Sequence, residues 1–406
     1  MDVTFYYDVV CPWAYLASRR IEAMAARAGG RVRWEPILLG GLLRATRAPD
    51  DPNAAMSPPR REVSRRDLAR TAAWYGERLQ PPTGHPARTV DAMRLCRLAP
   101  DGPTRVAVSH ALFAAYWRDG LDVSNRAVLA TVAGVHGLDV DALDTAPARQ
   151  ALFDATAAAA ARGVFGVPTV VTDDTLEWGQ DRMTRVFGPE ADDAAGPVAA
   201  GPAPAGTQLR LHHDFSSPFS YLGAAQIEAV AAARGVDVAW RPILLGAMFR
   251  DIGTPDVPLF EMSEAKRRWV YADLERQAAA ASVPFRFPTH FPIRSVLPLR
   301  VALAEPATTL PIYRAAWAHD RRIDTPQSLS TVLSDAGFDA GALLSAATSD
   351  PIKRALRDNT AAATAAGACG VPTFEIVDGD RTQIVWGADR LAHVDAVLGG
   401  WRPDLG

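Results

Sequence analysis

Cysteine is scarce in this chain of 406 residues, and neither sign of charge is in large excess. Its three cysteines (Cys11, Cys96 and Cys369) form no CxxC pair and therefore provide no disulfide framework. The formal net charge of -3 argues against a nucleic-acid-binding protein, which would normally present a basic face. No apolar run reaches membrane-spanning length. The histidines show no metal-ligand spacing, so we expect no metal site. The Walker and GxGxxG motifs of nucleotide-binding proteins are also missing.

What the sequence does contain is typical of a globular protein with two domains. Its length exceeds that of one ordinary core, and 48% hydrophobic with 22% charged residues fit a soluble protein. The N-terminus enters the run Val3–Tyr7 directly, without a basic segment or a cleavable apolar leader. We therefore expect a cytoplasmic protein with no nucleic-acid partner and no membrane partner.

An internal repeat divides the chain into two halves. The block Asp8–Leu16 recurs as Asp214–Leu222, and the order of all matching blocks is the same in both halves, which indicates a tandem duplication. Residues 189–206 between the halves are rich in Pro, Ala and Gly, which predicts an exposed linker. The domains are therefore predicted as 1–188 and 207–406, packed as a pseudo-dimer. The other matching blocks are Trp34–Gly40 with Trp240–Gly246, Gly166–Thr169 with Gly370–Thr373, and Trp178–Arg182 with Trp386–Arg390.

Both halves predict the same α/β layout. A strand, a helix and a second strand come first, and this unit must be right-handed. A helical insertion follows, then a strand after a Val-Pro pair, a hairpin signalled by Asp378-Gly379 in the second half, and a short helix. The expected strands are Val3–Asp8, Val32–Ile37, Leu209–Asp214 and Val238–Ile243. The expected insertion helices include Arg65–Tyr75, Val106–Tyr116 and Ala127–Val135, then Glu264–Gln277, Leu310–Trp317 and Ser328–Leu333.

Ser217 lies where the opening strand of the second half is followed by a helix. Pro218 is the expected first helical residue, where its missing N–H costs nothing. A hydroxyl there faces unpaired backbone N–H groups and the positive end of the helix dipole, which favours an anion such as a thiolate. A plain helix N-cap is the alternative, since serine is a common cap. The pairs Val167-Pro168 and Val371-Pro372, each just before a strand, are predicted to be cis.

The second-half motifs together resemble a known family. Ser217–Leu222, Pro242–Gly246, Gly370–Thr373 and Trp386–Leu391 are similar to the 2-hydroxychromene-2-carboxylate isomerases, which group with kappa-class glutathione transferases and DsbA-like thioredoxin folds. The resemblance covers nearly all of the second half and, more weakly, most of the first. It implies two tandem thioredoxin-like domains, each with an α-helical insertion. It also implies a glutathione-dependent isomerase or kappa-type transferase that acts on an electrophilic aromatic small molecule in aromatic-compound catabolism.

The resemblance assigns roles to particular residues. Ser217 matches the catalytic serine that hydrogen-bonds the glutathione sulfur. Arg250 stands where the family has Lys, and Gly253-Thr254 stands where Gly-Asn is usual, so another low-molecular-weight thiol is an alternative to glutathione. The implied thiol-contacting residues are Arg250, Gly253, Thr254, Val371, Pro372, Ala388, Asp389 and Arg390 in the second half, and Val167, Pro168, Gln180, Asp181 and Arg182 in the first.

The first half departs from this pattern at Cys11, which replaces the serine. A cysteine at a helix N-terminus is expected to have a lowered pKa, but Ala14 leaves no second cysteine to resolve a mixed disulfide. A buried, inert Cys11 is the alternative. We therefore expect the second half to be the better thiol site.

Two competing functions and one substrate contact remain open. The chain could be a DsbA-type thiol–disulfide oxidoreductase acting through Cys11, or a non-catalytic thiol-binding scaffold. Arg294 and Arg88 are candidates to hold a substrate carboxylate, with ordinary surface ion pairs as the alternative.

Overall fold

The computed structural model describes residues 1–49, 51–193, 196–197 and 201–405, and they divide into two compact units. The first unit comprises Met1–Pro52, Leu68–Gly196 and the C-terminal residues from Pro403. The second comprises Asn53–Asp67 and Pro197–Arg402. The segment Asn53–Asp67, which belongs to the first half of the sequence, thus groups with the second unit. The predicted linker 189–206 falls partly on residues 194, 195 and 198–200, which lie outside the described residues.

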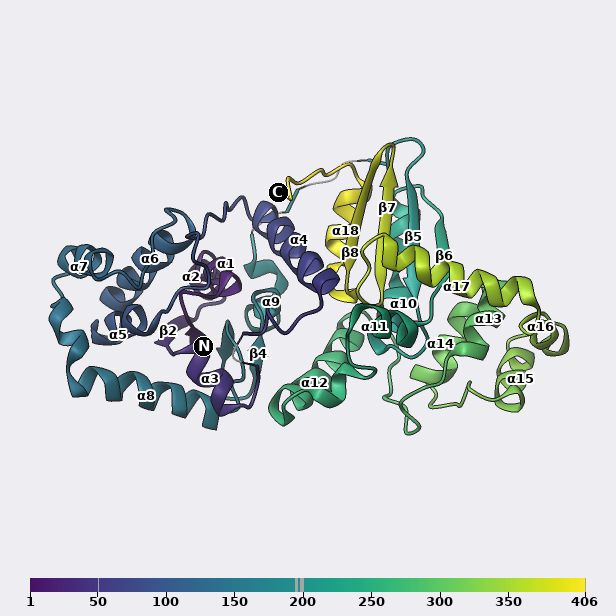
Figure 1. Ribbon diagram of the computed structural model, residues 1–406, viewed down its shortest axis with the longest axis horizontal. Helices are drawn as coiled ribbons and strands as arrows, with labels where there is room; N and C mark the ends of the chain where they lie inside the picture. The colour runs from purple at the N-terminus through teal and green to yellow at the C-terminus, as the bar shows by residue number, and fades with distance from the viewer. Residues whose placement is uncertain (50, 194–195, 198–200, 406) are drawn as a thin grey trace. The chain divides into compact units, whose positions relative to one another are not determined.

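The first unit contains a mixed four-stranded sheet in the order β2-β1-β3-β4. β1 is parallel to β2 and antiparallel to β3, which in turn is antiparallel to β4. β1 is buried from its second residue to its last because helices cover both faces of the sheet. The elements are β1 (Asp2–Tyr7), α1 (Pro12–Ser18), α2 (Ile21–Arg27), β2 (Arg31–Pro36), α3 (Leu39–Ala45), α4 (Pro58–Trp74, shared with the second unit), α5 (Val90–Leu98), α6 (Pro103–Trp117), α7 (Arg126–Val135), α8 (Ala146–Ala161), β3 (Thr169–Val171), β4 (Leu176–Trp178) and α9 (Met183–Phe187) (Figure 1).

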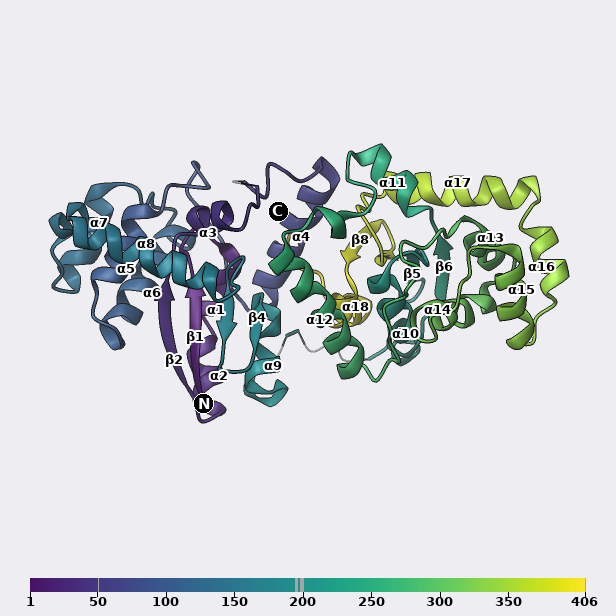
Figure 2. The ribbon, with the colours of Figure 1, turned by 90° about the horizontal axis from the view of Figure 1, so that it is seen from below.

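The second unit repeats this arrangement with the order β6-β5-β7-β8 and the same strand directions. Helix α17 lies on one face of the sheet, and α10 and α18 lie on the other (Figures 1 and 2). The elements are β5 (Gln208–His213), α10 (Pro218–Ala233), β6 (Val238–Pro242), α11 (Leu245–Ile252), α12 (Glu264–Ala280), α13 (Val296–Ala304), α14 (Thr309–Trp317), α15 (Pro326–Asp335), α16 (Ala340–Ala346), α17 (Asp350–Ala365), β7 (Thr373–Asp378), β8 (Arg381–Trp386) and α18 (Leu391–Leu398).

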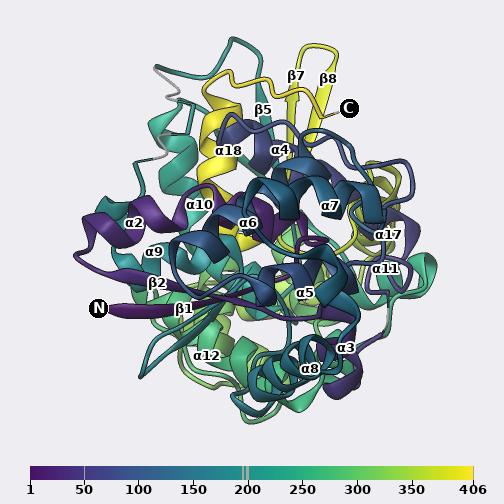
Figure 3. The ribbon, with the colours of Figure 1, turned by 90° about the vertical axis from the view of Figure 1, so that its left-hand side faces the viewer.

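The helical insertion of the first unit lies on one side of its sheet. Figure 2 shows α5, α6, α7 and α8 on one side of β1 and β2, with α2 and α9 on the other. In Figure 3, which views this unit from its insertion side, α5, α6, α7 and α8 lie toward the viewer. Each unit has its own hydrophobic core, in which insertion helices pack against the sheet.

The predicted α/β class is confirmed, with the same mixed four-stranded sheet and a helical insertion in each unit. Each predicted strand lies within about one residue of an observed one, and every predicted insertion helix overlaps an observed helix. The hairpin is also confirmed, with β7 ending at Asp378 and Gly379 in a left-handed conformation at φ 60°. Sequence patterns did not single out helices such as α8 and α17, whose many alanines weaken the apolar periodicity. Within the described ranges, no helix is both long and apolar enough to cross a membrane.

Candidate active site

Ser217 occupies the N-cap of α10, and Pro218 is the first helical residue. Its hydroxyl oxygen accepts the N–H of Ser220 at 3.2 Å, so the N-cap interpretation is correct. The hydroxyl proton points to the carbonyl oxygen of Val371, but at 3.4 Å this contact is long for an O–H···O hydrogen bond. The side chain therefore keeps a proton that can be redirected to a better acceptor at little cost.

The peptide of Val371 faces Ser217 and is incompletely hydrogen-bonded. The Val371-Pro372 bond is cis, as is Val167-Pro168, so both predictions are confirmed. Among the described residues, nothing accepts the N–H of Val371, and its carbonyl receives only the long Ser217 contact. The next carbonyl, of Pro372, accepts the N–H of Gly387 at 3.0 Å, which holds the segment after β8 beside this site. An unpaired N–H and C=O on one extended residue are suited to pairing with a peptide-like ligand.

A buried carboxylate fixes the loop that presents Ser217. Asp214 accepts the N–H of Ser216 at 2.9 Å and the N–H of Leu245, at the start of α11, at 2.8 Å. Burial raises the Asp214 pKa, against the lowering effect of hydrogen bonds from the Ser295 side chain and from these two N–H groups. Because Ser295 contacts Asp214, its neighbour Arg294 lies close to the base of this loop.

Asp8 has the equivalent position in the first unit, where it accepts the N–H of Leu39 at 2.8 Å and that of Val10 at 3.2 Å. Burial raises its pKa to about 6, although hydrogen bonds from Leu39, Val10 and Thr89 oppose the shift. Sequence reasoning gave neither aspartate a role. The available signal was that each is the first residue of the repeated nine-residue block.

The segment Asn53–Asp67 contributes side chains to the second unit near this site. The Arg390 guanidinium forms an ion pair with Asp67, with Nε at 3.1 Å from both carboxylate oxygens. Arg60 lies over the ring of Trp386, with its guanidinium carbon 5.5 Å from the ring centroid. Val63 packs in one cluster with Val371 and residues of α11. The sequence contained no local signal for this placement, because these partners are far apart along the chain.

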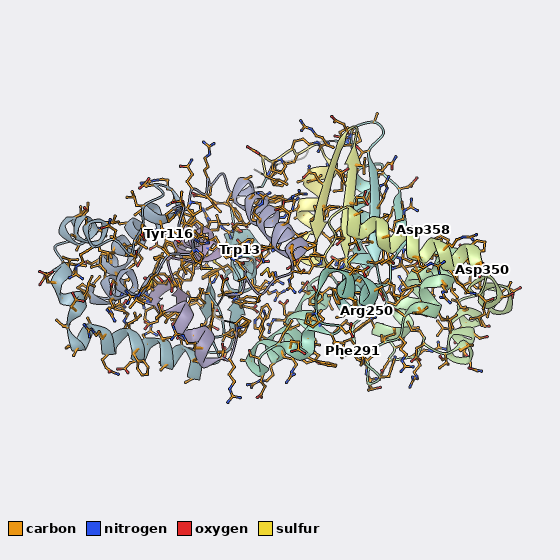
Figure 4. All side chains as sticks on the ribbon, in the orientation of Figure 1. Trp13, Tyr116, Arg250, Phe291, Asp350 and Asp358 are labelled. Carbon is orange, nitrogen blue, oxygen red and sulfur yellow. The ribbon has the colours of Figure 1, made fainter. Side chains whose placement is uncertain are left out.

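The other second-half residues expected at the thiol site differ in their exposure and in their hydrogen-bond and ion-pair partners. Gly253 ends α11 in the left-handed conformation, at φ 72°. The Thr254 hydroxyl donates to Ser57 at 3.4 Å, and Arg390 is also 3.2 Å from Asp389. Arg250, at the end of α11, is exposed, and among the described residues no carboxylate forms an ion pair with it (Figure 4). Because α11 packs against Val371, the structure brings this helix to the Ser217 side of the sheet.

The two candidate substrate arginines differ in their partners. Arg88 lies 3.8 Å from Asp91 in a helical i,i+3 pair and is mostly exposed. Arg294 is exposed, and no carboxylate in the described part of the chain forms an ion pair with it. Both roles stay predictions, with Arg294 the better placed to receive a new anion.

The expectation of a lowered pKa for Cys11 is wrong. Burial raises the pKa of the thiol to about 12. This effect outweighs hydrogen bonds from the N–H groups of Ala14 and Trp13 at the start of α1, which lower the pKa. The thiol donates to the carbonyl oxygen of Val167 at 3.2 Å. At neutral pH Cys11 is therefore a buried thiol that is already hydrogen-bonded, as in the inert alternative.

In the first half, Gln180 stands at the position that matches Ala388, and its side chain is bonded to other residues of the same unit. Gln180 is only 3% exposed, and its side-chain oxygen accepts from Arg20, which also forms an ion pair with Asp192. The Arg20 guanidinium lies over the ring of Tyr75, 3.7 Å from its centroid. Asp181 and Arg182 pair with each other. These contacts leave Gln180, Asp181 and Arg182 engaged within the first unit.

The described residues of the second unit contain no equivalent of this arrangement. In the matching blocks of the second half, Gln226 stands at the position of Arg20 and Ala388 at the position of Gln180. The Gln226 amide bonds to the carbonyl of Leu222 in its own helix, at 2.8 Å. The two candidate sites are therefore chemically unequal. Within the described residues, no group of His, Cys, Asp and Glu could hold a metal ion.

Comparison with known proteins finds a sequence profile that matches the chain twice and relatives that align with about half of the chain. The sequence profile described as "DSBA-like thioredoxin domain" matches residues 2–187 and again 208–399. The 2-hydroxychromene-2-carboxylate isomerase of Sphingobium xenophagum is 30% identical over 185 residues, covering 45% of this chain and 93% of that protein. Glutathione S-transferase kappa 2 of Caenorhabditis elegans is 27% identical over 202 residues, covering 46% and 89%. A solved 2-hydroxychromene-2-carboxylate isomerase structure gives a TM-score of 0.41 at 27% identity, covering 46% of this chain and 92% of its own.

Proposed function

Because the chain belongs to the DsbA-like thioredoxin family and has 2-hydroxychromene-2-carboxylate isomerases and kappa-class glutathione transferases as relatives, we propose that its second half is a glutathione-dependent isomerase or transferase site. The supporting observation is the pair formed by the Ser217 hydroxyl and the unpaired peptide of Val371. Holding a cysteinyl thiol needs a proton donor for the sulfur and a backbone pairing partner. Ser217 and Val371 offer these two groups, and their nearest polar atoms are 3.4 Å apart.

The residues of the site fit glutathione in three ways. Val371 offers an N–H and a carbonyl to the backbone of the cysteinyl residue. Ser217 can turn its proton from the carbonyl of Val371 to the sulfur, while its oxygen stays bonded to Ser220 at the positive end of α10. Arg250, exposed and without an ion pair among the described residues, offers charge to a carboxylate. Glutathione, when bound, supplies a nucleophilic thiolate that adds to an electrophilic substrate.

The chain's own residues then stabilise and orient the reacting groups. A charge-assisted hydrogen bond from Ser217 favours thiolate over thiol. Asp214 holds the loop and the start of α11 together, so that Ser217 and Val371 keep their spacing. Arg294, three residues after Phe291, is the candidate partner for an anionic substituent of the substrate.

The direct test is isothermal titration of the full chain with glutathione, followed by an assay of glutathione-dependent reaction with an aromatic electrophile. We expect one binding site per chain, because the first-half position is occupied by Arg20 and Gln180. Absence of binding heat would reject the glutathione proposal. Two equal sites per chain would reject its restriction to the second half.

The competing oxidoreductase is separated by an insulin-reduction assay with dithiothreitol as the reductant. A Cys11 thiol with a pKa of about 12 is a poor nucleophile at neutral pH, so no acceleration over the reductant alone is expected. Acceleration that disappears in Cys11→Ala would favour that alternative. The scaffold alternative predicts glutathione binding without turnover. The pseudo-dimer arrangement stays a prediction.

A further inference from the structure

A continuous set of aromatic rings extends from the Ser217 loop to the surface of the second unit. The indole N–H of Trp317, in α14, donates to the carbonyl of Phe215 at 2.8 Å and so anchors that loop. Phe287 lies edge-on to Trp317, with centroids 5.6 Å apart. Phe291 follows at 5.0 Å from Phe287, and Phe260 at 6.0 Å from Phe291 with an interplanar angle of 87°. Phe291 is labelled in Figure 4.

The outermost ring of this set is unusually exposed. Phe260 lies in a 3₁₀ turn, Pro258–Glu261, and retains 51% of its surface accessibility. Leu259 and Met262, on either side, are only partly buried. Single exposed apolar residues are common, and Phe153 on α8 is 68% exposed without a ring partner. Phe260 differs because its ring forms the end of a stack that leads to the candidate thiol site.

The first half of the sequence lacks the three phenylalanines of this stack, although the His85 ring lies edge-on to Trp117 at 5.1 Å. At the repeat separation, Pro81 replaces Phe287, His85 replaces Phe291 and Ala54 replaces Phe260. A tryptophan is retained, and Trp117 donates to the carbonyl of Val9 at 2.7 Å in the same way. His85 instead bonds to the hydroxyl of Tyr116 at 2.8 Å, which makes this region polar. Anchoring the loop therefore needs only the tryptophan, and the added phenylalanines require another explanation.

We propose that Phe260 and Phe291 form an aromatic platform that binds the flat, apolar ring of the electrophilic substrate, with Phe260 as a specificity-determining residue. This inference rests on the proposed function, because the platform would serve the thiol site of the second half. Aromatic rings favour offset or edge-on contact with another ring, and the free half of Phe260 provides such a surface. The occupant is a small planar molecule, since the platform consists of two rings, Phe260 and Phe291.

The platform is tested by binding of 2-naphthol, an unreactive planar probe, to the full chain by isothermal titration. Phe260→Ala is expected to weaken 2-naphthol affinity by about tenfold, because the probe can no longer bury the exposed half of the Phe260 side chain. Phe260→Tyr, which keeps the ring, should restore the affinity. The matched control is Phe153→Ala, which removes an exposed ring that has no ring partner and should leave the affinity unchanged.

Kinetics separate the platform from the thiol site. In Phe260→Ala, the KM for an aromatic electrophile, 1-chloro-2,4-dinitrobenzene, should rise by about tenfold with kcat unchanged, whereas the KM for iodoacetamide should stay the same. Glutathione affinity should not change. Equal 2-naphthol affinity in wild type and Phe260→Ala, or no binding to either, would overturn the platform. Failure of wild type to bind glutathione would instead overturn the proposed function, and the 2-naphthol comparison would still decide the platform.

Discussion

Replacing Ser217 by alanine separates its two roles, because each role makes a different measurable contribution. As an N-cap, the hydroxyl accepts one N–H, from Ser220, and its loss should lower the unfolding free energy by about 1 kcal/mol. As a donor to a thiolate, it would form a charge-assisted hydrogen bond worth roughly 1.5–3 kcal/mol. The proton is available for this role because its present bond to Val371 is 3.4 Å long. Losing the donor should raise the pKa of bound glutathione by about one to two units.

The assay is a pH titration of the thiolate ultraviolet absorbance of bound glutathione, in wild type and Ser217→Ala. Activity at neutral pH should fall by roughly ten- to a hundredfold and recover partly at high pH, because the helix dipole and backbone groups remain. The matched control is Thr325→Ala. Thr325 caps α15 by accepting the N–H of Ser328 at 3.2 Å, so this variant loses a similar cap elsewhere in the same unit. It should lose similar stability with no change in thiol pKa.

One result would refute this reasoning directly. If Ser217→Ala and Thr325→Ala lose similar stability, and both leave the glutathione titration midpoint at the wild-type value, Ser217 is a helix cap only. The activity of the second half would then need another source of thiolate stabilisation, for which the N–H groups at the start of α10 are the remaining candidates.

Three further predictions concern the first unit. With its pKa raised to about 12 by burial, Cys11 should remain unmodified by iodoacetamide at pH 8 in the native protein but react after denaturation; rapid labelling of the native protein, seen by peptide mass spectrometry, would contradict a buried, protonated thiol. Arg20→Ala removes the guanidinium that pairs with Asp192 and donates to buried Gln180, and should destabilise the first unit by roughly 3–5 kcal/mol, whereas Arg19→Ala, at a half-exposed pair with Glu77, should cost less than about 1 kcal/mol. Equal urea midpoints for these two variants would contradict the buried pair. Burial raises the Asp8 pKa from 3.8 to about 6. Since a raised carboxyl pKa stabilises the fold below the unfolded pKa, about 3 kcal/mol of stability should be lost as pH rises from about 4 through 6, and Asp8→Asn should flatten this slope in urea unfolding. An unchanged slope in the variant would assign it to other groups.

Local rules were enough to predict the strands, part of the insertion helices and the order in which they occur, but not alanine-rich helices such as α8 and α17. The repeat, the Pro at the first helical position, the Ser N-cap and the Asp-Gly hairpin are all encoded within a few consecutive residues. Backbone dihedrals and hydrogen bonds between near neighbours determine such features, so their sequence signals are reliable. The same signals were sufficient to predict the N-cap at Ser217 and the cis bonds before Pro168 and Pro372, but not the cis bonds before Pro86 and Pro292.

Only the tertiary structure decided the chemistry around these elements. The Cys11 pKa depends on desolvation by residues far away in the chain, and this effect reversed the expectation from the helix N-terminus. The pairing of Arg20 with Gln180, and of Asp67 with Arg390, joins segments separated by most of a domain or more. Local sequence patterns cannot specify such contacts, because they arise from how the chain packs. The sequence by itself therefore determined the helix N-termini at which a thiol site is predicted, and packing decided that the surroundings of Ser217 and Cys11 differ.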